Sequence, residues 1–455
     1  MASIDNSARG SRLNRSLFIF RRDLRVHDNT GLMAASRAAR EVVPCFILDD
    51  TILNRFEGHG YRKAFVFDSL RDLARQVKDQ GGVLNIVHER PEVAVERMIV
   101  KAGIDSVFVN RDYTPFSARR DRTIEALCKR LGISFHRLPD TLLNEPEAVR
   151  KADGSPYLVF TPYFRSANQR AVPAPDSAIP ANFCKQGFIH DEVPECEITS
   201  PVAAGRTGAQ GILKLISSLK DYAHTRDYPA LEGTSRLSCH LRFGTVSPRE
   251  VWHATANALG SNHPMLRQLY WRDFFTQIAF HYPHVFGHAF RRQYDRLTWN
   301  KDDDLLQAWC EGRTGFPLVD AGMRELVATG YMHNRVRMVA ASFLVKNLHI
   351  DWRIGEAFFA RHLIDYDPAV NNGNWQWVAS TGCDAQPYFR VFNPFRQQLK
   401  FDPDALYIKR WVSELARWSE RDIHGLDRRP EGYFPPIVDL KASAEEIKAR
   451  FKSLG

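Results

Sequence analysis

Short apolar segments alternate with amphipathic ones over the first 140 residues of the chain. Helical spacing of apolar positions marks residues 64–78 and 91–102. Apolar runs short enough to be buried strands occur at residues 17–20, 42–48, 83–87, 106–109 and 133–138. Strands that alternate with helices are typical of parallel βαβ units. We therefore expect an α/β domain with a doubly wound parallel sheet at residues 16–140.

The pattern changes after this region. Up to residue 207 the chain is rich in Pro, Ala, Asp and Ser and has few periodic apolar positions, which predicts an interdomain linker over residues 141–207. Residues 208–455 are expected to form an all-helical domain. Their apolar positions have helical spacing at residues 274–282, 315–329, 334–348 and 355–363.

Composition narrows the class of protein. The 455 residues suit two domains rather than one. No apolar run approaches the ~20 residues of a membrane span, and residues 1–15 read as a disordered lead-in without a signal-peptide core. The seven cysteines form no CxxC pair, which fits a reducing cytoplasm and argues against a structural zinc site. The net charge of +9 permits nucleic-acid binding without establishing it.

Two segments concentrate groups that carry chemistry. DYDPAVNNGNWQWVASTGCDAQPYFR, at residues 365–390, contains carboxylates, an Asn-Asn-Gly-Asn turn and two tryptophans. Any one of these residues could belong to a polar loop that caps a helix, but burying the whole set favours a ligand. GTSRLS, at residues 233–238, precedes an apolar helical pattern. It is either an ordinary helix cap or a phosphate site at a helix start.

Five motifs together resemble the photolyase/cryptochrome family, and most closely the cyclobutane pyrimidine dimer photolyases. Their order and spacing match over residues 16–400, and they read RRDLRVHDN (21–29), GTSRLS (233–238), LYWRDFF (269–275), MHNRVRMVAASFLVK (332–346) and NNGNWQW (371–377). The resemblance implies a deoxyribodipyrimidine photo-lyase. Such an enzyme extracts the dimer from DNA and splits it with an electron from light-excited, reduced FAD.

The resemblance also implies which residues hold the flavin. Arg337 and Asp365 match an ion pair beside the isoalloxazine, and Asp367 lies near the ring and ribose. Asn371 matches the residue that faces flavin N5. Plant cryptochromes usually have Asp at this position, so the Asn here favours a repair enzyme. The full set of implied cofactor contacts is Tyr222, Thr234, Ser235, Arg236, Leu237, Ser238, Gln268, Arg337, Asp365, Asp367 and Asn371.

Aromatic and cationic residues complete the implied site. Trp375, Trp352 and Trp299 match the chain that photoreduces FAD, from flavin to solvent, although each tryptophan could instead be core packing, as expected for Trp309 and Trp411. An extruded dimer could stack on aromatic walls at Trp271 and Trp377, and such stacking stabilises binding by ~1–3 kcal/mol per base. Phosphate contacts are implied for Arg226, Arg272, Arg335 and Arg390, with a solvated side chain an equal alternative for Arg226.

Three positions bear on the lesion. Enzymes for the (6-4) photoproduct carry histidines at the places of Asn334 and Met338, whereas the residue types here match cyclobutane dimer photolyases. Gln268 departs from that pattern, since those enzymes have Glu there and Gln is more typical of (6-4) enzymes. A Gln amide can still donate and accept hydrogen bonds. Gln268, Asn334, Met338 and Asn371 are therefore the candidate catalytic residues.

Several alternatives stay open at this point. The chain could be a blue-light signalling cryptochrome without repair activity, or a (6-4) photolyase, which only Gln268 suggests. A second chromophore in the α/β domain is also possible. Phe116 and Ser117 stand where folate binders carry Asn and Glu, which favours a deazaflavin over a folate. We expect a monomer in the cytoplasm that binds pyrimidine dimers in DNA, with no metal and no membrane contact.

Overall fold

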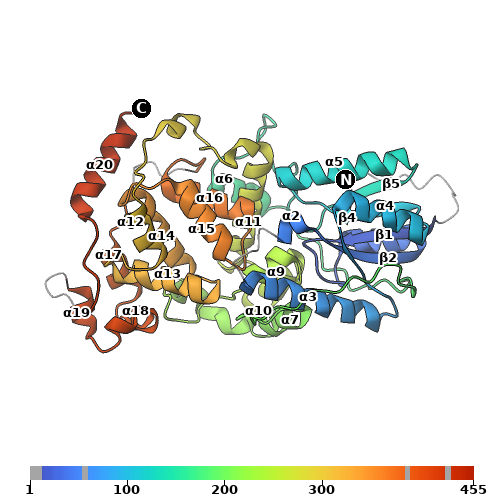
Figure 1. The fold of residues 1–455 in the computed structure, drawn as a ribbon, viewed down its shortest axis with the longest axis horizontal. Coiled ribbons are helices and arrows are strands. Elements are labelled where there is room, and N and C mark those ends of the chain that lie inside the picture. Colours follow the sequence, from blue (N-terminus) through green and yellow to red (C-terminus); the bar gives the residue numbers. More distant parts are fainter. Residues whose placement is uncertain (1–12, 54–59, 385–389, 426–431, 455) are drawn as a thin grey trace.

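The computed structural model describes residues 13–53, 60–384, 390–425 and 432–454. Figure 1 shows a sheet with helices on both faces at one end of the molecule and an all-helical region at the other. The sheet has the strand order β3-β2-β1-β4-β5 and every pair is parallel. Its strands are β1 (Leu13–Phe20), β2 (Ala39–Leu48), β3 (Asn85–His88), β4 (Ser106–Asn110) and β5 (Ser134–Leu138). The predicted doubly wound parallel sheet is confirmed.

Alternate residues of β1 build two cores because successive side chains of a strand point to opposite faces. Phe18 and Phe20 pack with residues of one pair of helices, whereas Leu17 and Ile19 pack with residues of the other pair. The first pair is α1 (Thr30–Ala38) and α3 (Gly60–Asp79), and the second is α4 (Pro91–Ala102) and α5 (Pro115–Arg130). The sequence pattern did not predict α1 and α5. A short helix α2 (Asp50–Leu53) follows β2.

The connector between the two regions is more ordered than predicted. It contains a helix, α6 (Phe160–Ala167), which belongs to a core cluster with residues of the helical region. Further along, Phe183 forms a parallel bridge with Val42 of β2, and His190 forms one with Ile86 of β3. The connector is therefore packed against both regions along its length.

The helical region is built around α13 to α16 and α18, which supply most of its largest core cluster. Short 3-10 helices occur at Ile216–Asp221, Pro283–Val285, Arg292–Arg296 and Ser413–Leu415. The α-helices are α7 (Gly205–Lys214), α8 (Tyr222–Thr225), α9 (Ser238–Phe243), α10 (Pro248–Leu259), α11 (Leu266–His281), α12 (Asp303–Cys310), α13 (Pro317–Thr329), α14 (Asn334–Lys346), α15 (Trp352–His362), α16 (Pro368–Ala379), α17 (Pro394–Phe401), α18 (Leu406–Trp411), α19 (Glu420–His424) and α20 (Leu440–Lys452).

The Asn-Asn-Gly-Asn segment is not the turn that its composition suggested. It lies inside α16, which begins at Pro368 after an N-cap at Asp367. Pro at the first helical position and Asp at the N-cap both favour a helix start. The buried Asn372 amide donates to the Val285 carbonyl at 2.9 Å, so this polar residue is satisfied within the helix packing.

No helix of the described ranges combines the length and the apolar character that crossing a membrane requires.

Buried ion pairs join the two regions. Arg25, from the RRDLR motif, donates to both carboxylate oxygens of Asp140 at 2.8 and 2.7 Å. Arg249 of α10 donates to Asp140 at 2.9 Å and to Asp28 at 2.9 Å. The Asp140 side chain is 0% exposed and that of Arg25 is 1% exposed. Burial alone would raise the pKa of Asp140, but Arg25 and Arg249 outweigh it and lower that pKa.

Asp140→Asn should therefore destabilise the protein by about 3–5 kcal/mol, because it leaves two buried guanidinium groups without their shared carboxylate. Chemical denaturation measures the change. Since the pKa of Asp140 is lowered in the folded state, its contribution is present above the unfolded pKa and disappears as the pH falls through the folded value. The control is Asp176→Asn, which breaks an exposed pair with Arg37 and should cost less than about 1 kcal/mol. Equal losses in both variants would contradict the prediction.

Candidate active site

A two-pronged ion pair lies at the centre of the helical region. Arg337 of α14 donates to Asp365 through two N–H···O bonds, at 3.2 Å from Nη1 to Oδ1 and 3.0 Å from Nη2 to Oδ2. Its Nε donates to the Met332 carbonyl at 2.7 Å, which fixes the plane of the guanidinium. Parallel N–H···O bonds of this kind give geometric specificity as well as strength. The structure thus brings together two residues that the resemblance had paired.

Tyr331 links this ion pair to the GTSRLS segment. The guanidinium carbons of Arg337 and Arg236 lie 5.6 and 5.3 Å from the centre of its ring. Thr234 hydrogen-bonds the Tyr331 hydroxyl, and burial raises the pKa of that hydroxyl. Sequence reasoning missed Tyr331, although it immediately precedes the MHNRVRM motif. Arg236 has a φ of 52°, so the segment turns through a left-handed residue just before α9.

Asn371 faces a carboxylate that the sequence analysis also missed. Its Nδ2 donates to the Glu356 side chain at 2.8 Å and to the Glu356 carbonyl at 3.3 Å. Burial raises the pKa of Glu356, while hydrogen bonds to Asn371 and Tyr366 act in the opposite direction. Glu356 therefore fixes which way the Asn371 amide points. The only sequence signal was an acidic residue at the start of the apolar stretch 355–363.

Asp367 connects α16 to the end of β1. One of its oxygens accepts from the backbone N–H groups of Ala369 and Val370 at 3.1 and 3.3 Å, and the other accepts from Arg22. Burial opposes the charged carboxylate, but Arg22 and two further arginines outweigh burial and lower the pKa of Asp367 to about 2. Asp367 is therefore charged at neutral pH and held from both regions.

The inner two predicted electron-transfer tryptophans are buried in the same core cluster. Trp375 and Trp352 are 2% and 1% exposed. A Cβ at Gly355 would lie 2.2 Å from the Trp375 ring, so only glycine allows α16 and α15 to pack this closely. Because Gly355 is three residues after Trp352, both share one face of α15. Trp309 also packs near Trp375, at 6.4 Å between ring centres, and donates to the Ala340 carbonyl.

Asn334 and Met338 meet on α14 next to the ion pair. They are four residues apart, and the Asn334 amide nitrogen lies 3.8 Å from the Met338 sulfur. Asn334 and Gln268 are exposed, and the Gln268 side chain makes no hydrogen bond to the other described residues. Arg335 pairs with Asp227 at 2.9 Å. An exposed amide, a thioether and a cation thus lie on one stretch of helix.

Trp271 stacks with two phenylalanines. Phe160 of α6 stacks on it with ring centres 3.5 Å apart and planes 6° apart. Phe275 stacks at 5.4 Å and 27°. Trp271 therefore already has two stacked aromatic partners. Its stacking with an extruded dimer stays a prediction.

The four expected phosphate-binding arginines have different surroundings. Arg226 lies 5.7 Å from the Tyr222 ring, Arg335 pairs with Asp227, and the exposed Arg390 lies 4.6 Å from the Phe392 ring. Arg272 is different. Its guanidinium donates to the backbone carbonyls of Thr141 and Leu241, and burial lowers its pKa. Arg272 therefore helps to hold segments of the two regions together, and its contact with DNA stays a prediction.

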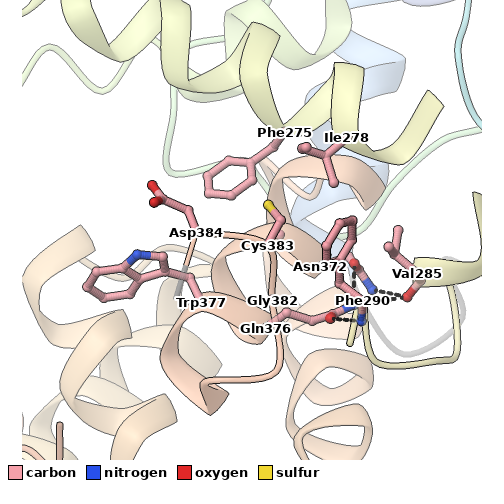
Figure 2. Close-up of a pocket in the computed structure, with 11 residues that line it drawn as sticks. Phe275, Ile278, Val285, Phe290, Asn372, Gln376, Trp377, Gly382, Cys383 and Asp384 are labelled. Carbon is pink, nitrogen blue, oxygen red and sulfur yellow. Dashed lines mark hydrogen bonds between the residues drawn. The ribbon is translucent and has the colours of Figure 1, made fainter. Parts of the chain in front are cut away.

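A small apolar pocket adjoins Trp377 (Figure 2). Phe275 and Ile278 of α11 line one side of it, and α16 lines the other through Gln376 and Trp377. Gln268, Asn334 and Met338 do not line it.

Comparison with known proteins identifies the family. The family model described as "DNA photolyase" matches residues 16–181, and that described as "FAD binding domain of DNA photolyase" matches residues 265–453. The chain belongs to the DNA photolyase family. Curated photolyases named deoxyribodipyrimidine photo-lyase include those of Streptomyces griseus, 37% identical over 96% of this chain and 98% of that protein, and Agrobacterium fabrum, 36% identical over 96% and 97%.

Solved photolyase structures share the fold over nearly the whole chain. An archaeal photolyase from Sulfolobus tokodaii with two FAD molecules is 39% identical, with a TM-score of 0.86 over 96% of this chain and 100% of that one. A class III photolyase from Agrobacterium tumefaciens is 33% identical, with a TM-score of 0.89 over 100% and 99%. A Synechocystis cryptochrome is 27% identical, with a TM-score of 0.84 over 97% and 100%. The fold and the FAD-binding domain expected from the sequence are thus confirmed.

Asp365→Asn should reduce flavin affinity by about tenfold or more, because Arg337 loses a charged partner whose hydrogen bonds are worth roughly 1.5–3 kcal/mol. The ratio of flavin to protein absorbance after purification and titration of the FAD-free protein measure the loss. Asp351→Asn serves as the control, since Asp351 pairs with Arg353 at the start of α15. Full FAD content in Asp365→Asn would show that the ion pair does not hold the flavin.

Proposed function

We propose that this chain repairs cyclobutane pyrimidine dimers in DNA, using light and reduced FAD. One observation carries the proposal: α14 presents Asn334 and Met338 next to the Arg337–Asp365 ion pair on the same rigid helix. Met338, which suits a lesion, therefore directly follows Arg337, which suits a flavin, in the chain. Relatives named deoxyribodipyrimidine photo-lyase support the assignment.

The residues of the site fit FAD. The edge of an isoalloxazine ring alternates hydrogen-bond donors and acceptors, and Arg337, Asp365 and Asn371 offer both kinds of partner. Arg242 has a buried Nη1 without a hydrogen-bond partner among the described residues, close to Asp367. Tyr222, Thr234, Ser235, Leu237 and Ser238 would lie along the phosphates, with Arg236. When bound, FAD supplies the electron for repair, and the protein's task is to bind and orient it.

The lesion-facing residues favour the cyclobutane dimer over the (6-4) photoproduct. Repair of the (6-4) lesion needs a proton donor, and the nearest imidazole on α14 is His333. Its Nδ1 accepts from the Arg335 backbone N–H at 3.2 Å, so it caps the helix. Burial and the neighbouring Arg337 lower the pKa of His333 to about 4. This histidine is neutral at pH 7, and a cyclobutane dimer, which opens on gaining an electron, does not need it.

Gln268 is compatible with this assignment. Its exposed amide is free to pair with the carbonyl and N–H edge of a pyrimidine, because an amide both donates and accepts. Compared with a carboxyl group it adds no charge and no proton. We expect repair to proceed with weaker electrostatic stabilisation of the reduced dimer.

The chain's partner is DNA that contains pyrimidine dimers, and Trp377 provides an aromatic wall for the extruded bases. Arg226, Arg335 and Arg390 would contact the phosphates. All seven cysteines are free in the structure, which supports work in a reducing cytoplasm. We also propose that the protein acts as a monomer.

A second chromophore would fit where β1 and β4 adjoin. The strand order reverses at this point, which is where ligands enter open α/β sheets. Buried Nη2 atoms of Arg21 and Arg120 have no hydrogen-bond partner among the described residues there. Ser117 stands where folate binders carry Glu, and its hydroxyl donates to Asp112 at 2.8 Å. A flavin or deazaflavin suits this site better than a folate, and the Sulfolobus tokodaii relative holds two FAD molecules.

Reduced enzyme should restore an oligonucleotide that carries a cyclobutane thymine dimer under blue light, and should leave a matched (6-4) oligonucleotide unrepaired. Chromatography of the illuminated strands measures both reactions. Repair of the (6-4) lesion alone would mean that Gln268 outweighs Asn334 and Met338. Repair of neither lesion by FAD-loaded protein would favour a signalling cryptochrome.

Trp352→Phe should block photoreduction of oxidised FAD while sparing repair by chemically reduced enzyme, because phenylalanine is far harder to oxidise than tryptophan. Flavin absorbance under steady illumination and the dimer assay separate the two activities. Trp418→Phe, a substitution in a partly buried tryptophan outside the proposed path, is the control. Loss of both activities in Trp352→Phe would indicate a structural role.

A further inference from the structure

We propose that α20 acts on the electron-transfer path by shielding Trp299. It encloses the indole N–H of Trp299, so that oxidised Trp299 keeps its proton. This inference rests on the proposed role of Trp299 as the outermost tryptophan. The segment that carries Trp299 lies beside the start of α15, since Asn300 forms a parallel bridge with Ile350, two residues before Trp352. Figure 1 shows α20 along the outer edge of the helical region, at the end opposite the sheet.

Arg450 of α20 holds the chain on both sides of Trp299. Its Nη1 donates to the Thr298 carbonyl at 2.8 Å, and its Nη2 donates to the Asn300 side-chain oxygen at 3.1 Å. Glu446, one helical turn earlier, accepts from Arg450 at 2.5 Å. These bonds fix the backbone that carries the indole, so Arg450 is a positioning residue for Trp299.

Apolar residues of α20 cover the ring. Ile447 is 0% exposed and Phe451 is 8% exposed, and with Leu297 they form a small cluster against which Trp299 packs. Trp299 remains partly exposed, but its Nε1 is buried and has no hydrogen-bond partner among the described residues. A buried indole N–H usually finds a partner. The part of Trp299 that would release a proton therefore faces the interior.

Helix α20 is held against α14 and the residues that follow it. Ser443 of α20 accepts from the Asn347 side chain at 3.1 Å, and its carbonyl lies 2.9 Å from His349 Nε2. The Lys346 ammonium lies 4.3 Å from the Phe451 ring centre. α20 is thus attached at its first turn and at its last, with Trp299 between these points and the protein core.

The arrangement controls what happens after photoreduction. One electron leaves Trp299 for each electron that the flavin gains, and Trp299 is left as an indole radical cation. The cation is neutralised by passing its Nε1 proton to an acceptor or by taking an electron from outside. The first route is closed because Nε1 is buried and has no acceptor among the described residues. An external thiolate can supply one electron, becoming a thiyl radical. Without it, the electron returns to Trp299.

Flash photolysis of the full-length, FAD-loaded protein distinguishes protonated from neutral tryptophan radicals by their absorption. The unaltered protein should show the radical cation, decaying by recombination with no solvent deuterium effect. Phe451→Ala and Arg450→Gln should yield the neutral radical with about a tenfold longer lifetime, since opening a buried N–H to water is worth roughly one hydrogen bond. Lys448→Ala, on the exposed side of α20, should behave like the unaltered protein.

Neutral radical formed equally fast in the unaltered protein and in both variants would overturn the proposal. Dimer repair by the chemically reduced variants checks that they fold and bind flavin, and Arg450→Gln serves if Phe451→Ala is unstable. Trp299→Phe separates the two levels of inference. If it leaves photoreduction unchanged, the electron-transfer role of Trp299 fails; if it abolishes photoreduction while the α20 variants change nothing, only the role of α20 fails.

Discussion

Buried arginine–carboxylate pairs between the carboxyl edge of the sheet and the helical region determine the rest of the architecture. Arg22 reaches from the end of β1 to Asp367, and Arg25 and Arg249 share Asp140. Breaking a buried pair leaves an uncompensated charge, which is costly. The pairs therefore fix how the two regions meet. Asp367 is also the N-cap of α16, so the same charges set the start of the helix that carries Asn371, Trp375 and Trp377.

In the site, charged and polar contacts orient one set of residues and apolar packing arranges another. Around the residues proposed to bind the flavin, hydrogen bonds orient each polar group: Asp365 holds Arg337, and Glu356 holds Asn371. Around the tryptophans, close packing decides the arrangement, as where Gly355 admits the Trp375 ring. Low exposure makes both effects stronger, because unpaired polar groups and cavities are each expensive inside a protein.

Much of the fold was predictable because the apolar periods of strands and helices differ. Periodicity alone located the five strands and six helices. These helices are α3, α4, α13, α14, α15 and the second half of α11. α5 was missed because its buried stripe is narrow, with Ile124, Leu127 and Cys128 among many charged residues. The asparagines of α16 suggested a turn because propensity cannot show that Asn372 is satisfied by a carbonyl 87 residues away. Glu356, Tyr331 and the Phe160 stack on Trp271 are contacts between segments distant in sequence, which local patterns do not encode.

The packing of the connector has a consequence for building hybrid enzymes. Phe160 is part of the helical region's aromatic cluster around Trp271, whereas Phe183 belongs to the core beneath the sheet. The connector therefore passes from one core to the other between residues 167 and 183. A chimera that exchanged the α/β half of this chain with that of a relative should place its crossover there. It would also have to match Cys239, Phe243 and Ile364, which the helical region contributes to the core beneath the sheet.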